Sequence, residues 1–215
     1  MDFRTVAIAG LGAAALAGCN TAGDLVVEEG VGITALRSVC PAVGVPDYTG
    51  AVTLFSPAGA VTADALDVTA TLTNVTTTCD DSSERVYAQA NFEVLGQRRD
   101  TRGARTVELP YFATVVQGGS NVVSKRVGRV ALRFADGEYR ASTSGAATGQ
   151  VLRSAATLPE EIRREITRER KPGDADAALD PMADPEVRAA VQRASFELLV
   201  GFQLTQDQLR YNATR

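Results

Sequence analysis

Clustered carboxylates are the first candidates for chemistry in this sequence, because oxygen-rich groups can bind Ca²⁺, which takes about six to eight oxygen ligands. One cluster comprises Asp174, Asp176, Asp180 and Asp184. Its spacing lacks the glycine and the closing glutamate of an EF-hand loop, so we interpret it as a solvated loop and expect no metal site. Asp80, Asp81 and Glu84, close to Cys79, form a second group. We interpret this group as an exposed turn between strands.

Nucleophilic catalysis is restricted by the absence of histidine from the chain. This absence excludes Ser-His-Asp and Cys-His mechanisms and histidine-ligated zinc. A serine activated by a lysine is another arrangement, and Ser124 adjoins Lys125. Neighbours in a strand point to opposite faces of the sheet, so we do not expect this pair to react. Paired carboxylates remain an alternative, although no pair stands out. We therefore expect no catalytic residues and no cofactor.

The charge of the chain argues against nucleic acid as a partner, because the formal net charge is −4 and phosphate binding needs a basic surface. One charged stretch could meet anionic headgroups, at about 1 kcal/mol per cation. Its cations are Arg163, Arg164, Arg168, Arg170 and Lys171, and they alternate with Glu160, Glu161, Glu165 and Glu169. The glutamates cancel most of the positive field, so we expect an exposed, ion-paired helix face.

The N-terminal segment has the pattern of an export signal. An apolar run from Val6 to Leu16 is too short for a bilayer core, which takes about 20 residues, but fits the apolar part of a signal peptide. It leads into Leu16-Ala17-Gly18-Cys19. These four residues resemble the lipobox of bacterial lipoproteins. The resemblance implies that residues 1–18 are removed and that Cys19 carries a lipid on its sulfur.

A nucleotide-binding pattern, G-x-G-x-x-A, overlaps the same segment at Gly10, Gly12 and Ala15. In a dinucleotide-binding fold the glycines approach the pyrophosphate, and an acidic residue about 20 positions later, here Glu28, binds the ribose. Small residues around Gly18 interrupt the helix that this fold requires, and strands and helices do not alternate downstream. We therefore favour the lipobox.

The lipoprotein resemblance also bears on the other cysteines. The chain has three, and acylation of Cys19 leaves Cys40 and Cys79. An even remainder in an exported protein predicts one disulfide. Two separate buried thiols are the alternative.

Residues 33–157 are dominated by alternation of apolar and polar residues. Val68–Leu72 and Val86–Val94 alternate in this way, which is typical of half-buried antiparallel strands. A similar run over Val107–Val115 precedes two glycines, at 118 and 119, and the run 122–134. This arrangement predicts a hairpin.

Two further glycines, Gly137 and Gly145, are expected to mark the turns that follow this hairpin. Residues 158–194 then depart from the strand pattern, and we interpret them as an insertion. Asp184 and Pro185 are N-cap and first-turn residues. The apolar residues Val187, Ala190, Val191 and Ala194 recur at helical spacing after them. They predict a short amphipathic helix.

The C-terminal residues predict a core strand and a final helical turn. Phe196, Leu198, Val200, Phe202 and Leu204 share one strand face. Thr205 and Gln208 form a capping box, which predicts a helical turn as far as Tyr211.

Together these patterns predict one mainly β domain over residues 31–215, with seven or eight short strands and the 158–194 insertion. The arrangement resembles an antiparallel β-sandwich of the immunoglobulin or fibronectin type III kind. The resemblance is architectural, because the chain has no tryptophan and so lacks the Cys-Trp-Cys signature. A small β-barrel is the alternative. Residues 19–30 are expected to form a tether between lipid and domain.

The expected function is that of a non-catalytic binding or assembly module held at a membrane by lipid, with an envelope protein as its partner. Asn20 differs from the aspartate that often retains bacterial lipoproteins at the inner membrane. We expect the outer membrane, on the periplasmic side, with the inner membrane as the alternative. Two other classes remain open: a histidine-free hydrolase with paired carboxylates, and a lipoprotein that binds a small ligand in an apolar pocket.

Overall fold

The computed structural model describes residues 38–168, 173 and 179–214. The expected signal segment, the tether and Cys19 lie outside these residues. The strands are β1 (Ala42–Gly44), β2 (Ala51–Phe55), β3 (Leu66–Asp80), β4 (Arg85–Arg98), β5 (Arg105–Gln117), β6 (Asn121–Phe134), β7 (Arg140–Leu152) and β8 (Phe196–Phe202). The helices are α1 (Arg153–Ala156), α2 (Glu160–Thr167), the 3₁₀ turn η1 (Pro181–Ala183), α3 (Pro185–Ala194) and α4 (Gln206–Ala213).

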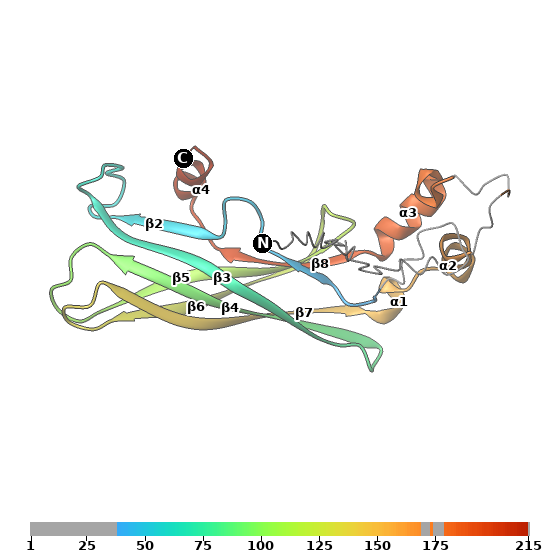
Figure 1. The fold of residues 1–215 in the computed structure, drawn as a ribbon, viewed down its shortest axis with the longest axis horizontal. Coiled ribbons are helices and arrows are strands. Elements are labelled where there is room, and N and C mark those ends of the chain that lie inside the picture. The colour runs from blue at the N-terminus through green and yellow to red at the C-terminus, as the bar shows by residue number, and fades with distance from the viewer. Residues whose placement is uncertain (1–37, 169–172, 174–178, 215) are drawn as a thin grey trace, which may run out of the picture.

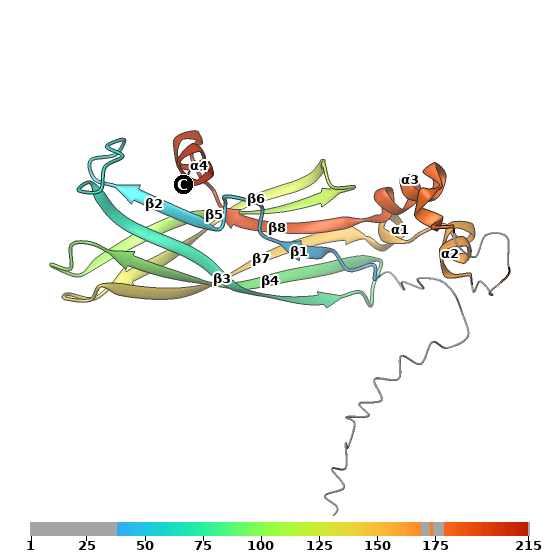
Figure 2. The same ribbon diagram turned by 45° about the horizontal axis from the view of Figure 1, so that its top comes forward.

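The strands form two four-stranded sheets, in the orders β1-β8-β5-β6 and β2-β3-β4-β7. Neighbouring strands are antiparallel except β1 and β8, which are parallel. Figures 1 and 2 show strands running along the length of the molecule, with α1, α2 and α3 together at one end. We call this the helical end. The opposite end, where the β4–β5 and β6–β7 connections lie, is the loop end. The prediction of a mainly β domain is confirmed.

One hydrophobic core lies between the inward faces of the two sheets. In β4 every second residue is buried, namely Val86, Ala88, Ala90, Phe92 and Val94. The sheet opposite contributes, among others, Leu109, Val115, Val130, Leu132, Leu198 and Val200. The period-two alternation of the sequence therefore identified the buried faces correctly, because successive side chains of a strand point to opposite sides.

Glycines make room for large side chains in the core, and one of them lies where the sequence predicted a turn. A Cβ at Gly145 would lie 2.4 Å from the Phe92 ring, and one at Gly96 would lie 2.4 Å from a methyl of Leu132. Gly145 was expected at a turn, but it lies within β7. Its role is to make room for an aromatic ring of the neighbouring strand. Gly137 does lie in the β6–β7 connection, with φ of +80°.

The strands differ from the prediction in length. β3 to β7 each have 13 to 15 residues, whereas the sequence predicted short strands. Asn74 illustrates the physical reason. Its φ is +51°, in the left-handed region, and it lies where the register of β3 against β4 shifts between Thr73 and Thr76. A turn-forming residue is thus accommodated as a bulge within a continuous strand.

The C-terminal elements follow the sequence closely. Asp184 caps α3 by accepting from the backbone N–H groups of Glu186 and Val187. Thr205 and Gln208 form the predicted capping box of α4. β8 ends at Phe202, earlier than predicted, and Leu204 packs against the core from the connection to α4.

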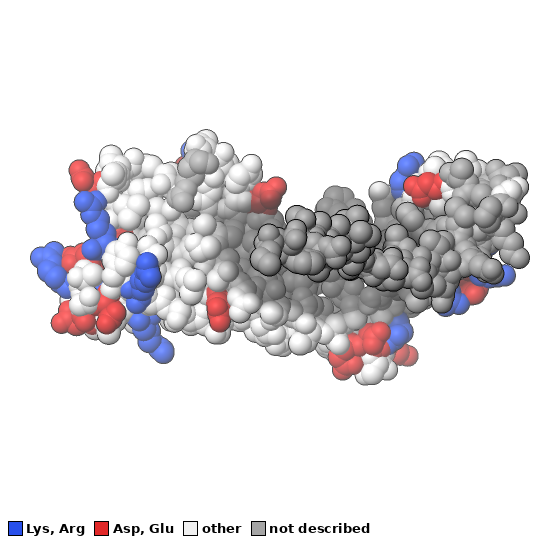
Figure 3. All heavy atoms as spheres, viewed as in Figure 1, with Lys and Arg blue, Asp and Glu red and all other residues white. Residues whose placement is uncertain are grey.

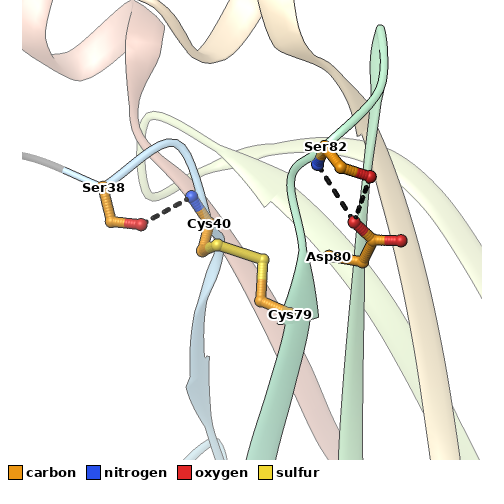
Figure 4. Close-up of a disulfide and its surroundings, with 5 residues drawn as sticks. All are labelled: Ser38, Cys40, Cys79, Asp80 and Ser82. Atoms are coloured by element: carbon orange, nitrogen blue, oxygen red, sulfur yellow. Dashed lines mark hydrogen bonds between the residues drawn. A yellow bond between two sulfur atoms is a disulfide. The ribbon is translucent and has the colours of Figure 1, made fainter.

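A disulfide joins the two sheets near the helical end. Cys40, just before β1, is bonded to Cys79 in β3, with the Cα atoms 6.2 Å apart. Figure 4 shows this bond beside the β3–β4 hairpin, where the Asp80 carboxylate accepts hydrogen bonds from Ser82. The structure therefore contains the disulfide and the exposed turn that the sequence predicted.

A buried arginine closes the loop end. Arg98, the last residue of β4, is only 1% exposed. Its guanidinium donates to four backbone carbonyl oxygens, at 2.7 to 2.8 Å. The acceptors are Thr101 and Gly103 in the β4–β5 connection, and Ala135 and Glu138 in the β6–β7 connection. One side chain thus binds both of these crossings between the sheets.

These two connections also bind each other. The Gly103 N–H donates to the Asp136 carboxylate, and the Gly137 N–H donates to the Thr101 carbonyl. Figure 3 shows that basic and acidic side chains are interleaved at the surface of this end. One of the acidic groups is Asp100. Hydrogen bonds from the side chain and backbone of Arg102 hold its pKa well below the usual range.

The disulfide yields a stability prediction. In a Cys19→Ser background, replacing both Cys40 and Cys79 by serine should lower the free energy of unfolding by about 4 kcal/mol, because the disulfide limits the unfolded chain. Urea unfolding with and without reductant measures the effect. Reductant should destabilise the parent chain and leave the serine variant unchanged. Equal midpoints for parent and variant would contradict the prediction.

Arg98 yields a second prediction. Arg98→Ala should lower the free energy of unfolding by about 3 to 5 kcal/mol, because removal of a buried polar partner leaves buried groups unsatisfied. Its exposed neighbour provides the control: Arg99→Ala should cost less than about 1 kcal/mol, since Arg99 pairs with Asp64 at the surface. Chemical denaturation of both variants checks this. A similar cost for the two variants would show that Arg98 does not hold the connections.

Candidate functional site

A surface hollow of about 700 Å³ lies at the helical end. It is lined by Glu84 of the β3–β4 hairpin, by Leu152, Arg153 and Ser154 at the junction of β7 and α1, and by Thr157, Leu158 and Pro159 before α2. These segments meet because β4 pairs with β7, which sets Arg85 opposite Leu152. The hollow therefore depends on strand pairing between residues far apart in the chain.

Arg153 is the main polar group of this hollow, and the hairpin fixes its position. Its backbone N–H donates to the Glu84 carbonyl at 2.8 Å, and its side-chain Nε donates to the Ser83 carbonyl at 2.9 Å. These bonds hold the start of α1 against the β3–β4 hairpin. Within residues 38–168, 173 and 179–214 no carboxylate forms an ion pair with Arg153. The two terminal NH₂ groups of its guanidinium are thus suited to donate to an anionic group.

Two acidic residues belong to the same end of the molecule as Arg153. Glu84 lines the hollow, and Asp80 lies nearby in the same hairpin. The pKa of Asp80 is lowered, first by hydrogen bonds from the side chain and backbone of Ser82, and further by the positive charge of Arg153. Asp80 is therefore negative at neutral pH. The site offers both signs of charge, which suits polar recognition. A general acid would instead need a raised pKa.

Of the four aspartates weighed as a calcium cluster, the structure describes two, and each caps a helical element. Asp180 caps η1 by accepting from the Met182 N–H, and Asp184 caps α3. Asp174 and Asp176 lie outside the described residues. Among those that are described, no three Asp, Glu, Cys or His side chains are grouped as metal ligands.

The serine and lysine pair and the charged helix also have clear positions. Ser124 lies opposite Val115 in the sheet, and the Lys125 ammonium lies 5.4 Å from the centre of the Phe112 ring. In α2, Arg163 and Arg164 both pair with Glu160 at the surface. The expectation of an ion-paired helix face is confirmed for these residues, whereas Glu169, Arg170 and Lys171 lie outside the described residues.

A second hollow, of about 370 Å³, lies beside α4 and is lined by Tyr48, Gly50, Ala51, Thr71, Leu72 and Asn212. The Asn212 amide donates to the carbonyls of Tyr48 and Ala51, at 2.7 and 2.8 Å. Its polar group thus serves to dock the terminal helix on β2.

Sequence reasoning identified neither hollow. Both are built from segments that come together only through sheet pairing and helix docking, and no local motif marks them. The polar groups involved, Glu84, Arg153 and Asn212, are ordinary surface residues when taken singly.

None of the helices in the described ranges is long and apolar enough to span a membrane. Comparison of the chain with protein-family models, with curated proteins and with solved structures finds no match. Inference about function therefore rests on the residues and their arrangement.

Proposed function

We propose that this chain is a lipid-anchored protein of a bacterial envelope that binds a partner protein without catalysis. The observation that carries the proposal is the Cys40–Cys79 disulfide, because such bonds persist mainly in oxidising compartments outside the cytoplasm. The lipobox-like residues ending at Cys19 supply the anchor. With Asn20 after this cysteine, the outer membrane, facing the periplasm, is the proposed location.

The architecture proposed for the domain is a sandwich of the immunoglobulin kind. Two four-stranded sheets around a single core support this proposal. The chain order differs from that of immunoglobulin domains, in which the first strand pairs with the second. Here β1 pairs with the last strand, β8. The proposed likeness therefore concerns the packing of the sheets and not their connections.

The helical end is the proposed contact surface for the partner. Its hollow combines Glu84 and Arg153 with the half-exposed side chain of Leu152. Charged groups of both signs around an apolar side chain resemble the composition of a small interface, in which charges select the partner and apolar groups add affinity. No specific observation favours the hydrolase alternative. Among the residues that the structure describes, the two carboxyl groups with a shifted pKa are Asp80 and Asp100, and both pKa values are lowered.

The anchor is tested by Cys19→Ala. This change should abolish metabolic labelling with palmitate and release the protein from membranes, because the sulfur that would carry lipid is lost. The parent chain expressed in parallel is the control. Continued labelling of the variant, together with its retention on membranes, would refute the anchor.

The contact surface is tested by photocrosslinking in intact envelopes. A photoreactive benzoyl-phenylalanine in place of Leu152 should give one discrete adduct. The same group in place of Leu95 should not, although the two leucines are equally exposed, at 51% and 50%. Adding Glu84→Gln to the Leu152 probe should weaken the adduct severalfold, because one charge of the hollow is removed. Identical adducts from both positions, or none from Leu152, would contradict the assignment.

A further inference from the structure

The strand β6 lies at an edge of its sheet, since the order β1-β8-β5-β6 gives it a single neighbour. Its first seven residues, 121–127, are exposed whichever way their side chains point. The strand contains no acidic residue, but it has the cations Lys125, Arg126, Arg129 and Arg133. In a chain of net charge −4, this strand is a local concentration of positive charge.

The β6 cations form no ion pair among the residues that the structure describes, unlike several other surface arginines. Elsewhere at the surface, Arg99 pairs with Asp64, Arg102 with Asp100, Arg105 with Asp67, Arg163 with Glu160 and Arg210 with Asp207. Lys125 lies over the Phe112 ring of the neighbouring strand, with its ammonium 5.4 Å from the ring centre. The positive charge of β6 is therefore not neutralised within the described fold.

Apolar side chains alternate with these cations. Val123 and Val127 are 49% and 58% exposed. Val127 shares a sheet face with Lys125 and Arg129, because residues two apart in a strand point the same way. The exposed face of β6 is thus both basic and apolar along its length.

Protection against edge-to-edge aggregation does not account for this composition. Edge strands are often protected by a charge or a bulge, and β6 has a bulge where its register shifts beside Val115. The strand β7, at an edge of the other sheet, can be compared with β6. It has a single charged residue, Arg140, at its start. β6 has four cations over a similar length, more than protection requires.

We propose that β6 is a contact surface for an anionic lipid membrane, with Lys125, Arg129 and Arg133 at the phosphates and the valines at the headgroup boundary. This inference rests on the proposed lipid anchor. The first described strand, β1, belongs to the same sheet as β6. Ala42, near the point where the described chain begins, shares a cross-sheet row with Val122, through Glu197 and Val116. β1 and β6 are opposite edges of this sheet, and three strand spacings of about 4.8 Å place them about 14 Å apart.

The test measures vesicle binding of the chain from residue 19 onward with Cys19→Ser. This chain keeps every residue of the core cluster, which spans Val52 to Phe202. Sedimentation with vesicles of about 30% phosphatidylglycerol in phosphatidylcholine should show binding, whereas phosphatidylcholine alone should show none. Binding should disappear at about 1 M NaCl, where the screening length is about 3 Å.

The variant Lys125→Gln/Arg129→Gln/Arg133→Gln should bind about 100-fold more weakly, at about fivefold per cation. The matched control, Arg85→Gln/Arg188→Gln/Arg210→Gln, removes the same charge from other elements and should bind within about twofold of the parent. Unfolding midpoints of both variants establish that they fold.

Several results would overturn the membrane assignment: no binding to anionic vesicles, equal binding to neutral ones, or equal losses in the two variants. Binding to polyglutamate without binding to vesicles would assign β6 to an acidic peptide instead. The outcome is separate from that of the anchor. Absence of palmitate labelling from the parent chain, with intact vesicle binding, would be a failure of the anchor alone. Labelling of the parent chain at Cys19 without vesicle binding would be a failure of this inference alone.

Discussion

The hydrogen bonds of Arg98 are the interaction on which the sheet arrangement most depends. A charge buried without partners costs several kcal/mol, yet no carboxylate in the described part of the chain pairs with this guanidinium. Four carbonyl oxygens bind it instead. They come from the two connections that cross between the sheets at the loop end. The guanidinium keeps all four hydrogen bonds only when both connections lie against it. This arrangement fixes the ends of the four long strands that they join.

The helical end is held by different means. There the Cys40–Cys79 bond links the segment before β1 to β3, so each end of the long sheets has its own link. Between the ends, packing depends on glycines that leave room for large side chains. At Gly145, for example, a side chain would meet the Phe92 ring of the neighbouring strand. Exposure on both strand faces is found beyond this packed region, at residues 76–80 of β3 and 121–127 of β6. The exposed surfaces thus follow from where the core ends.

Local patterns predicted much of this fold. The alternation from Val86 to Val94, the capping box at Thr205 and the cap of α3 each depend on residues close together in the sequence. The same alternation, continued, places Arg98 on the inward face, but a charged residue is expected at the surface. The buried guanidinium is hydrogen-bonded by backbone carbonyls that lie up to 40 positions away in the sequence. The hollow at Arg153 likewise needs the pairing of β4 with β7, which no local pattern specifies.

Two groups of described cations, those at the loop end and those along β6, differ in their physical consequences. At the loop end the ion pairs are exposed and contribute little to stability, and their fields largely cancel at short range. Along β6 the charges have no such partners, so their field extends into solvent. At physiological salt that field decays over about 8 Å. Any anionic partner must therefore come within that distance of several cations at once. Because the cations are spread along an extended strand, only a surface or a chain that lies along the strand can do so.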